Sequence, residues 1–353
     1  MITNQYSSNP PVIVLYNLDQ CWPPEEKTEI HQMVQSFEKE LSREGHSTEI
    51  ACLDGETIQP LLSKYDPREY IVFNWCEEIP GVPKSSSMVA RQLEEMGFTY
   101  TGTNSTALKL SQNKQAIKKR LDKLNIPTPR WKIFTSPDVK DWENFPAIAK
   151  PVYEHCSFGI THEAVVTTPQ ELSERVELLL DTFRQPILVE DFITGREFHV
   201  TVVGNRKLDV FPIAEMDFSC IPNTTDRLCT YDSKFSPGSP DYQLIQLRLP
   251  AELSAEENQA LINVAIAAYR ATDCRDYARL DIRERDGVFY VLDINPNADI
   301  SPDASVCLSA KEAGLSFGGF GSLLVNLAAL RHPVYKKQVA VSQPAQELIP
   351  IPA

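Results

Sequence analysis

With 353 residues, of which 42% are hydrophobic, the chain can bury two or three compact cores and is not a disordered protein. Its net charge of −14 and pI near 5.0 argue against a nucleic acid or an anionic membrane as the main partner, although a local basic pocket could still hold phosphates. The sequence has neither an apolar run approaching the ~18 residues of a membrane span nor a leader with a basic segment, so we expect a cytoplasmic protein.

The N-terminal third alternates strand-like and helix-like stretches, a pattern typical of an open parallel sheet covered by helices. PVIVLYNL (11–18) predicts a buried strand, and a helix should follow Pro-Pro-Glu-Glu because apolar residues then recur at helical spacing: Ile30, Met33, Val34, Phe37 and Leu41. TEIACL and YIVFNW predict two further strands, and SSSMVARQLEEMG predicts a second helix. We expect this first unit to cover residues 1–103.

Residues 104–195 begin with a basic helical stretch, STALKLSQNKQAIKKRLDKLNIP, followed by strands at WKIF and FPAIAKPV and a loop at 153–159. Thr168-Pro-Gln-Glu171 has the form of a capping box with proline at the first helical position, which predicts a helix over about 169–183. PILVEDFI (186–193) predicts a strand. Residues 196–333 are mostly strand-like, with one helix capped by Ser254 and Glu257 and a closing helix near 321–330. Residues 334–353 are expected to form a tail.

The eight cysteines are scattered along the chain. They form no CxxC pair and accompany no cluster of histidines, so the sequence suggests neither a zinc site nor a thioredoxin-like motif. Reduced thiols are the expectation for a cytosolic protein.

The segment ARLDIRERDGVFYVLDINPN (278–297) has the form of a hairpin that carries polar residues. Alternation puts Arg279 and Asp281 on one face of the first strand, and Asp293 and Asn295 on one face of the second. A strict two-residue turn would oppose these faces, whereas a bulge or a three-residue loop would align them, and we expect alignment. The converging oxygens would suit Mg²⁺ carrying nucleotide phosphates. The alternative is a structural Arg279–Asp281 salt bridge, which leaves Asp293 and Asn295 unexplained.

Two lysines are candidates for phosphate binding. Lys114 lies early in the basic helix, although a solvated lysine-rich face with Lys109, Lys118 and Lys119 is the alternative interpretation. Lys150 follows the apolar strand FPAIA, so its ammonium group would emerge from a sheet interior, where an unpaired charge is costly. A phosphate oxygen is a natural partner for it.

Two further segments could contact a nucleotide. The loop YEHCSFGI contains Ser157 and Gly159, whose small size lets backbone N–H groups approach an anion. In ILVEDFITGREF (187–198), backbone groups could contact an adenine edge, while Glu190 and Glu197 accept bonds from its amino group and from ribose hydroxyls. The alternative is that both glutamates lie on the surface at a strand end.

Taken together, Lys114, Lys150, VEDFITGREF, Arg279-Leu-Asp281 and Asp293-Ile-Asn295 occur in the order and approximate spacing of the ATP-grasp fold. Over residues 100–330 the chain resembles D-alanine–D-alanine ligases, including TYTGTN before the first lysine and Lys234 of YDSKF, which resembles a family lysine near the γ-phosphate. The resemblance implies an α/β (α+β) fold class: a Rossmann-like N-terminal domain (1–103), a central ATP-grasp subdomain (104–195) and a C-terminal antiparallel-sheet subdomain (196–333).

The resemblance also implies residue roles around an ATP held between two antiparallel sheets. Nucleotide contacts would come from Lys114, Lys150, Gly159, Glu190, the backbone of Asp191 and Ile193, and Glu197. Two Mg²⁺ ions would be bound by Asp281, Asp293 and Asn295. The catalytic residues would be Ser157, Lys234 and Arg279, the last of which would stabilise a tetrahedral oxyanion. The implied enzyme is an ADP-forming carboxylate–amine ligase that works through an acyl phosphate, as a homodimer joined through its N-terminal unit.

The substrate pocket departs from the family pattern. LYNLDQCWPPEE stands where the family has a glycine-rich turn, NWCEEIPGVPKSSS replaces a His-Gly-x-x-Gly-Glu-Asp-Gly segment, and Phe235 replaces a tyrosine. Asp299 and Ala304 fall opposite a family glycine and serine. Ser301 and Ser305 lie close by and could take over the role of that serine. The substrate candidates are therefore Asp299, Ser301 and Ser305. We therefore expect small-molecule substrates, a carboxylate and an amine such as an amino acid, of a natural-product or small-peptide type.

Two alternatives remain open from the sequence. One is a true D-alanine–D-alanine ligase with a remodelled pocket. The other is a non-catalytic ATP-binding module, against which Arg279 counts, because a pure binder does not need an arginine that stabilises an oxyanion.

Overall fold

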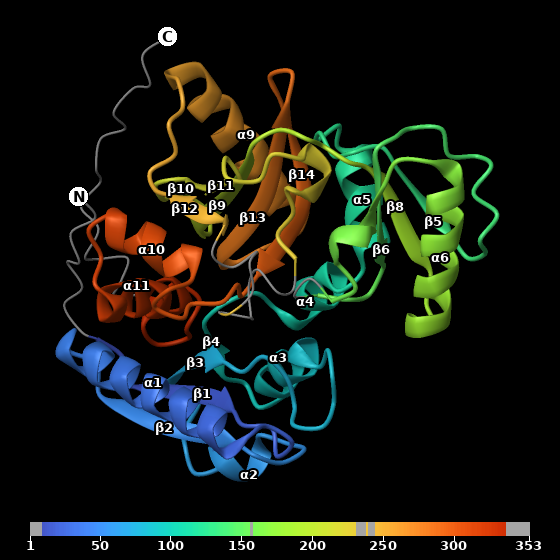
Figure 1. Cartoon of the computed structure of the whole chain (residues 1–353). Helices are drawn as coiled ribbons and strands as arrows, with labels where there is room; N and C mark the ends of the chain where they lie inside the picture. Colours follow the sequence, from blue (N-terminus) through green and yellow to red (C-terminus); the bar gives the residue numbers. More distant parts are fainter. Residues whose placement is uncertain (1–8, 156–157, 231–237, 239–243, 337–353) are drawn as a thin grey trace. The chain divides into compact units, whose positions relative to one another are not determined.

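The computed structural model describes residues 9–155, 158–230, 238 and 244–336. The chain divides into two compact units (Figure 1). Unit 1 comprises Met1–Ser105, Gly204–Arg206 and Ile300–Ala353, and unit 2 comprises Thr106–Val203 and Lys207–Asp299. The described part of unit 1 has one sheet and that of unit 2 has two, and each unit has its own buried apolar residues.

Unit 1 contains a four-stranded parallel sheet in the order β2-β1-β3-β4. Its strands are β1 (Val12–Asn17), β2 (Thr48–Leu53), β3 (Ile71–Trp75) and β4 (Thr99–Tyr100). The central strand β1 is buried along its whole length, which explains its uninterrupted apolar sequence. The predicted open parallel sheet is confirmed.

In the part of unit 1 that the structure describes, the helices are α1 (Pro24–Arg43), α2 (Gln59–Leu62), α3 (Ser86–Glu95), α10 (Ser305–Glu312) and α11 (Phe317–Ala329). The Phe37 ring on α1 packs against Phe73 of β3 and Phe317 of α11, with ring centroids 4.6 and 4.8 Å apart. Gly321 admits this ring, because a Cβ there would lie 2.5 Å from it. Helix α11 thus begins earlier than predicted and, with α10, packs in the same unit as the N-terminal sheet.

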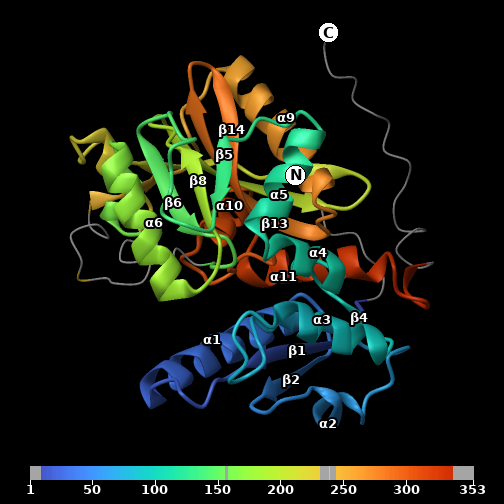
Figure 2. The same cartoon turned by 90° about the vertical axis from the view of Figure 1, so that its right-hand side faces the viewer.

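The described residues of unit 2 form two antiparallel sheets, visible in both views (Figures 1 and 2). The first, in the order β5-β8-β6-β7, consists of β5 (Trp131–Phe134), β6 (Ala147–Pro151), β7 (Val165–Val166) and β8 (Ile187–Asp191). The second, in the order β12-β11-β9-β13-β14 with β10 on β9, consists of β9 (Glu197–Gly204), β10 (Leu208–Val210), β11 (Ala214–Asp217), β12 (Gln246–Arg248), β13 (Asp276–Arg285) and β14 (Val288–Pro296).

Helices cover one face of each sheet of unit 2. Helix α6 (Pro169–Phe183) shares an apolar core with the first sheet, and α5 (Lys114–Lys123) and α9 (Ala255–Ala271) share one with the second. The basic stretch forms two helices, α4 (Ser105–Ser111) and α5, because the Asn113 side chain caps α5 by accepting from the N–H of Ala116 at 3.0 Å. The mixed α and β architecture agrees with the predicted fold class.

The two predicted capping boxes have different outcomes. Ser254 and Glu257 make both reciprocal bonds at the start of α9. At α6, Thr168 accepts from the N–H of Glu171, and the carboxylate of Glu171 accepts at 2.7 Å from the N–H of Thr167, one residue before the cap. Helix α6 nevertheless spans the predicted residues.

Three expectations from composition concern the whole chain. The cysteines in the described ranges form no disulfide, and Cys156 lies outside those ranges. Among the described helices, none is long and apolar enough to cross a bilayer. Most of the expected tail also lies outside the described residues, which end at Lys336.

Candidate active site

The six-stranded sheet of unit 2 has one apolar and one polar face. The apolar face contributes to the core with α5 and α9 through Phe198, Val200 and Val202 of β9 and Ala278, Leu280 and Ile282 of β13. Because side chains alternate along a strand, the residues between them face the other way. These are Glu197, His199 and Thr201 of β9, and Arg279, Asp281 and Arg283 of β13.

A β-bulge in β14 brings two more polar side chains to this face. Asp293 pairs with Asp281 across the ladder, and the next pair joins Val291 to Ile282, so Leu292 is an extra residue on β14. The core positions shift accordingly, from 289 and 291 before the bulge to 294 after it.

The bulge confirms the expected alignment of the two strand faces. The turn itself has two residues, Asp286 and Gly287, both with positive φ, which matches the twist of a tight hairpin. Asn295 lies opposite Arg279 in the ladder. The alignment therefore comes from an extra residue within the strand and not from a longer loop.

The aligned side chains form a network of opposite charges. Arg279 donates to both oxygens of Asp281, at 2.7 and 3.1 Å, and the amide of Asn295 donates to Asp281 Oδ2 at 3.1 Å. Asp293 Oδ2 lies 3.7 Å from Lys114 Nζ. The Arg279–Asp281 salt bridge is thus present together with the converging oxygens, so the two interpretations of this hairpin are not exclusive.

The electrostatics favour charged carboxylates. Burial alone would raise the pKa of Asp293, but Lys114 and Lys150 lower it below its ordinary value. Arg279 is partly buried, which disfavours its charge, yet Asp281 raises the pKa of the guanidinium above its ordinary value. Both groups are therefore ionised near neutral pH.

Glu190 of β8 lies between two buried lysines. Its Oε1 is 2.5 Å from Lys118 Nζ, and its Oε2 forms an ion pair with Lys150. Glu190 and Lys118 are each 1% exposed, and Lys150 is 7% exposed. Burial would raise the pKa of Glu190, but the two ammonium groups lower it below its ordinary value. The sequence predicted a phosphate as the partner of Lys150. In the structure its partner is the carboxylate of Glu190, and the phosphate contact stays a prediction.

Two alternative interpretations from the sequence are corrected here. Glu190 and Glu197 are buried, so they are not surface glutamates at a strand end. In the basic stretch, Lys109 and Lys119 are exposed, but Lys114 and Lys118 are buried one helical turn apart. The solvated-face interpretation is therefore wrong for half of these lysines, and the i, i+4 spacing of Lys118 from Lys114 was the signal that could have identified it.

The segment between β8 and β9 is fixed to β13 by two arginines. Arg283 Nε donates to Glu197 at 2.7 Å, and its Nη1 donates to the carbonyl of Ile193 at 2.7 Å. Arg285 pairs with the carboxylate of Asp191 at 2.6 Å, while the N–H of Asp191 donates to the carbonyl of Arg130. Sequence reasoning missed both arginines, although the alternation that selected Arg279 continues through positions 283 and 285.

Glu197, His199 and Cys229 form a second group that the sequence analysis missed. Their ligand atoms lie within 4.8 Å of one another, and all three residues are buried. Glu197 is shared with the Arg283 ion pair, and His199 Nε2 lies 3.8 Å from Asp281 Oδ1. The group thus borders the carboxylates of the polar face.

Three other residues were predicted to take part in the site: Ser157, Gly159 and Lys234. Ser157 and Lys234 lie outside the described residues. Gly159 has φ +76°, a Cβ there would lie 3.0 Å from the ring of Phe183, and its carbonyl accepts from Arg175 at 2.8 Å. These contacts give Gly159 a structural role.

The three substrate candidates are divided between the two units. Asp299 is exposed and ends the second segment of unit 2, whereas Ser301 and Ser305 belong to unit 1. Ser305 is the first residue of α10, and the carbonyl of Ser301 accepts from the N–H of Ala304. Their substrate roles stay predictions.

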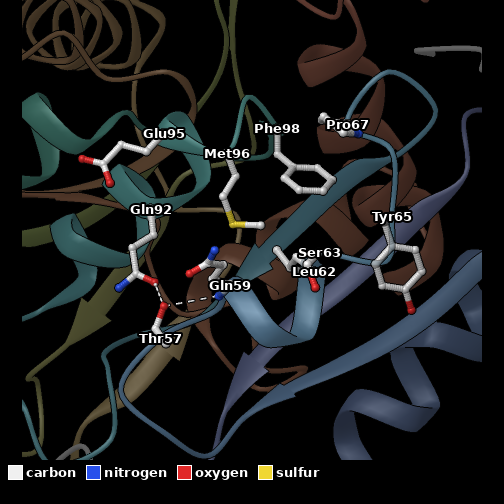
Figure 3. A pocket seen from close by; sticks show the side chains of 10 residues that line it. All are labelled: Thr57, Gln59, Leu62, Ser63, Tyr65, Pro67, Gln92, Glu95, Met96 and Phe98. Carbon is white, nitrogen blue, oxygen red and sulfur yellow. Dashed lines mark hydrogen bonds between the residues drawn. The ribbon is translucent and has the colours of Figure 1, made fainter.

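A separate cavity of about 510 Å³ lies in unit 1, between α2 and α3. Figure 3 shows its lining side chains: Thr57, Gln59, Leu62, Ser63, Tyr65, Pro67, Gln92, Glu95, Met96 and Phe98. Glu95 is the sole charged group in this lining, so the cavity lacks the cations that a nucleotide phosphate requires.

The sequence and the fold match known proteins over most of the chain. Residues 121–327 match the family described as D-ala D-ala ligase C-terminus. The D-alanine–D-alanine ligase of Desulforudis audaxviator is 30% identical over 250 residues, which cover 68% of this chain and 76% of the relative. The uncharacterized protein y4sG of Sinorhizobium fredii is 29% identical over 296 residues, covering 82% and 84% of the two chains.

A solved structure shares the fold. The D-alanine–D-alanine ligase from Bacillus anthracis complexed with ATP aligns with a TM-score of 0.71 at 19% identity, over 93% of this chain and 99% of that one. The protein is therefore an ATP-grasp enzyme, an ADP-forming ligase of the carboxylate–amine type. It belongs to the D-alanine–D-alanine ligase family, as the resemblance implied.

Proposed function

We propose that the protein uses Mg·ATP to activate a small carboxylate as an acyl phosphate and joins it to an amino acid as an amide. The observation that carries this proposal is the convergence, within unit 2, of buried lysines and oxygen ligands. The cations are Lys114, Lys118, Lys150 and Arg279, and the oxygen ligands are Glu190, Asp281, Asp293 and Asn295.

The donor set of the hairpin fits Mg²⁺. Asp281 and Asp293 lie directly opposite each other, and like charges in such a pair are destabilising unless a cation joins them. Asn295 adds an amide oxygen. Each of the three side chains can thus offer an oxygen atom as a ligand, which hard cations prefer. We assign two Mg²⁺ ions to Asp281, Asp293 and Asn295. When bound, they would neutralise phosphate charge.

The nucleotide roles that we propose are those that the family resemblance implies, and the position of each group supports them. Lys114 and Lys150 would contact the phosphates with their ammonium groups. For adenine we assign Glu190, the carbonyl of Asp191 and the N–H of Ile193, because the N–H of Asp191 and the carbonyl of Ile193 already have partners. Glu197, held by Arg283, would accept from ribose hydroxyls.

The proposed chemistry has two steps. A carboxylate oxygen of the first substrate attacks the γ-phosphorus of ATP, the bond between this phosphorus and the bridging oxygen breaks, and ADP leaves. The amine of the second substrate then attacks the acyl carbon, and phosphate leaves. Arg279 would stabilise the oxyanion of this second step, because a partly buried guanidinium acts strongly where negative charge develops.

The sequence departures around the substrates support a pair other than two D-alanines. LYNLDQCWPPEE and NWCEEIPGVPKSSS replace the family segments near the first substrate, and Asp299 replaces a glycine. A natural-product or small-peptide ligase is therefore our proposal for the substrate class. The second candidate is a D-alanine–D-alanine ligase, the activity after which the Desulforudis audaxviator relative is named.

The test is ADP release with Mg·ATP against a panel of amino acids, singly and in pairs, with mass spectrometry of the products. A product mass equal to two substrates minus water supports ligation and identifies both partners. D-alanine dipeptide as the best product would favour the second candidate. Nucleotide binding without ADP release for any acid and amine, including the D-alanine pair, would contradict ligation and favour the binding module. Light scattering would test the implied homodimer.

A further inference from the structure

Lys118 is buried against four oxygen atoms from three parts of unit 2. Its ammonium group donates to Thr128 Oγ1 at 2.7 Å and to the carbonyls of Val291 and Leu292 at 3.2 Å each, and it lies 2.5 Å from Glu190 Oε1. An ammonium group has three protons, so the hydrogen bonds to Thr128, Val291 and Leu292 use its full capacity, and Glu190 Oε1 is held as an ion pair without a hydrogen bond. Lys118 therefore acts on its protein neighbours and has no proton left for a ligand.

Two of these acceptors are the carbonyls at the bulge of β14. Leu292 is the extra residue, and Val291 is the last residue paired before it. The segment after α5 also binds the backbone at the bulge. Thr128 Oγ1 donates to the Val291 carbonyl at 2.9 Å, and the N–H of Val291 donates to the carbonyl of Pro127. Lys118 thus reaches the bulge together with this segment.

The bulge determines where the proposed metal ligands point. Without the extra residue, Asp293 and Asn295 would have the same parity as Val291 and would face the apolar core. Burying a carboxylate there is costly, and the two side chains would be removed from Asp281. The donor set therefore exists because β14 keeps its bulge.

Lys118 also fixes Glu190. It holds one carboxylate oxygen, while Lys150 holds the other. Glu190 comes from the first sheet of unit 2 and the bulge from the second, so one ammonium group connects both sheets.

We propose that Lys118 is a positioning residue that maintains the β14 bulge, and with it the register of the metal ligands, and that links this register to Glu190 at the nucleotide. The proposal rests on the proposed function in one respect, namely that Asp281, Asp293 and Asn295 bind the divalent cations. A lysine with a merely structural role would contribute to stability without affecting metal binding selectively.

The test compares Lys118→Met with Lys119→Met, which removes an exposed ammonium group from the adjacent position. Mn²⁺ titration followed by electron paramagnetic resonance in the presence of ADP measures metal affinity without turnover. Calorimetry of ADP with and without Mg²⁺ measures how much the metal strengthens nucleotide binding. Residues that orient metal ligands typically change metal affinity about tenfold to a hundredfold. We expect Lys118→Met to lose Mn²⁺ affinity by about tenfold or more, and Lys119→Met to match the wild type.

A second variant keeps the test decisive if Lys118→Met does not fold. Thr128→Val keeps Lys118 and its pair with Glu190 but removes the hydroxyl donor to the Val291 carbonyl. We expect a smaller loss of Mn²⁺ affinity in the same direction. Unchanged Mn²⁺ affinity in the variants that fold would overturn the role proposed for Lys118 and would leave the proposed function untouched. A wild-type protein that binds neither ADP nor Mn²⁺ would instead sink the proposed function, and this inference with it.

Discussion

Glu190→Gln is the sharpest perturbation of the buried charges, because it keeps the shape of the side chain and removes one charge. Lys118 and Lys150 would then lie close together in the interior without their shared carboxylate. Removing one partner of a buried ion pair typically costs about 3–5 kcal/mol. This cost cannot greatly exceed the free energy of deprotonating one lysine. For a lysine with a pKa of about 10.4, deprotonation at pH 7 costs about 5 kcal/mol.

We therefore expect Glu190→Gln to lower the free energy of unfolding by about 3–5 kcal/mol, a large share of the ~5–15 kcal/mol of a typical protein. Urea unfolding followed by tryptophan fluorescence measures this loss. The matched control is Glu174→Gln on α6, where the glutamate is exposed and the new side chain can still accept from Gln170. Such a surface change should stay within about 0.5 kcal/mol of the wild type.

The pH dependence gives a second test with a definite sign. In the wild type the pKa of Glu190 is lowered, so its stabilisation is fully present above the unfolded value and is lost as pH falls through the folded value. In Glu190→Gln, burial lowers the pKa of a lysine, so the unfolded state binds more protons and stability rises from pH 7 towards pH 10. A deficit no larger than that of Glu174→Gln, or one that does not shrink over this range, would refute the reasoning.

Three further outcomes are expected. Asp293→Ala should lower Mg·ATP turnover by about a hundredfold or more with the fold retained, as judged by circular dichroism, and unaltered turnover would remove it from the metal site. Lys150→Met should weaken ATP binding in calorimetry by about tenfold to a hundredfold, the equivalent of one charged hydrogen bond, and unchanged affinity would contradict its phosphate role. Gly159→Ala should lower the thermal midpoint more than Gly81→Ala, because both glycines have φ near +75° but only at Gly159 would the new Cβ meet the Phe183 ring; equal shifts would exclude that contact.

Most of the fold could be predicted from local patterns. The apolar run of β1, the helical spacing of α1 and the proline-led start of α6 each fix an element through interactions within a few residues. The packing of α11 against α1 could not be predicted in this way, since it depends on Gly321 meeting Phe37 from a segment almost 300 residues away. Periodicity shows which face of a helix is apolar but not which element covers it.

The candidate site shows the same limit. Alternation correctly placed Arg279 and Asp281 on one face of the strand, and the alignment with Asp293 required one extra residue somewhere between the two strands. The sequence does not show where this residue lies, because Val291 and Leu292 are both apolar and either could be the extra residue. Lys118 was missed for a related reason: its burial depends on acceptors in β8 and β14, which come 72 and more than 170 residues later in the chain.

The charges of the site explain why neither the lysines nor the carboxylates can be assigned alone. Three buried lysines, Lys114, Lys118 and Lys150, and the partly buried Arg279 lie close to three carboxylates, those of Glu190, Asp281 and Asp293. Each cation is close to a carboxylate, so every residue of the set can be explained as part of a structural ion pair. A structural core would gain more from apolar residues, however, since buried ion pairs seldom exceed well-packed hydrophobic replacements in stability.

The arrangement is therefore better explained if ligands can replace the partners in these ion pairs. A triphosphate could take the lysines away from Glu190 and Asp293, and divalent cations could take the place of Lys114 and Arg279 beside the two aspartates. Lys118 is the member of the set that cannot be exchanged, because its protons are committed to the bulge and to Thr128. This difference predicts that replacing Lys150 weakens the nucleotide directly, whereas replacing Lys118 acts through the metal ligands.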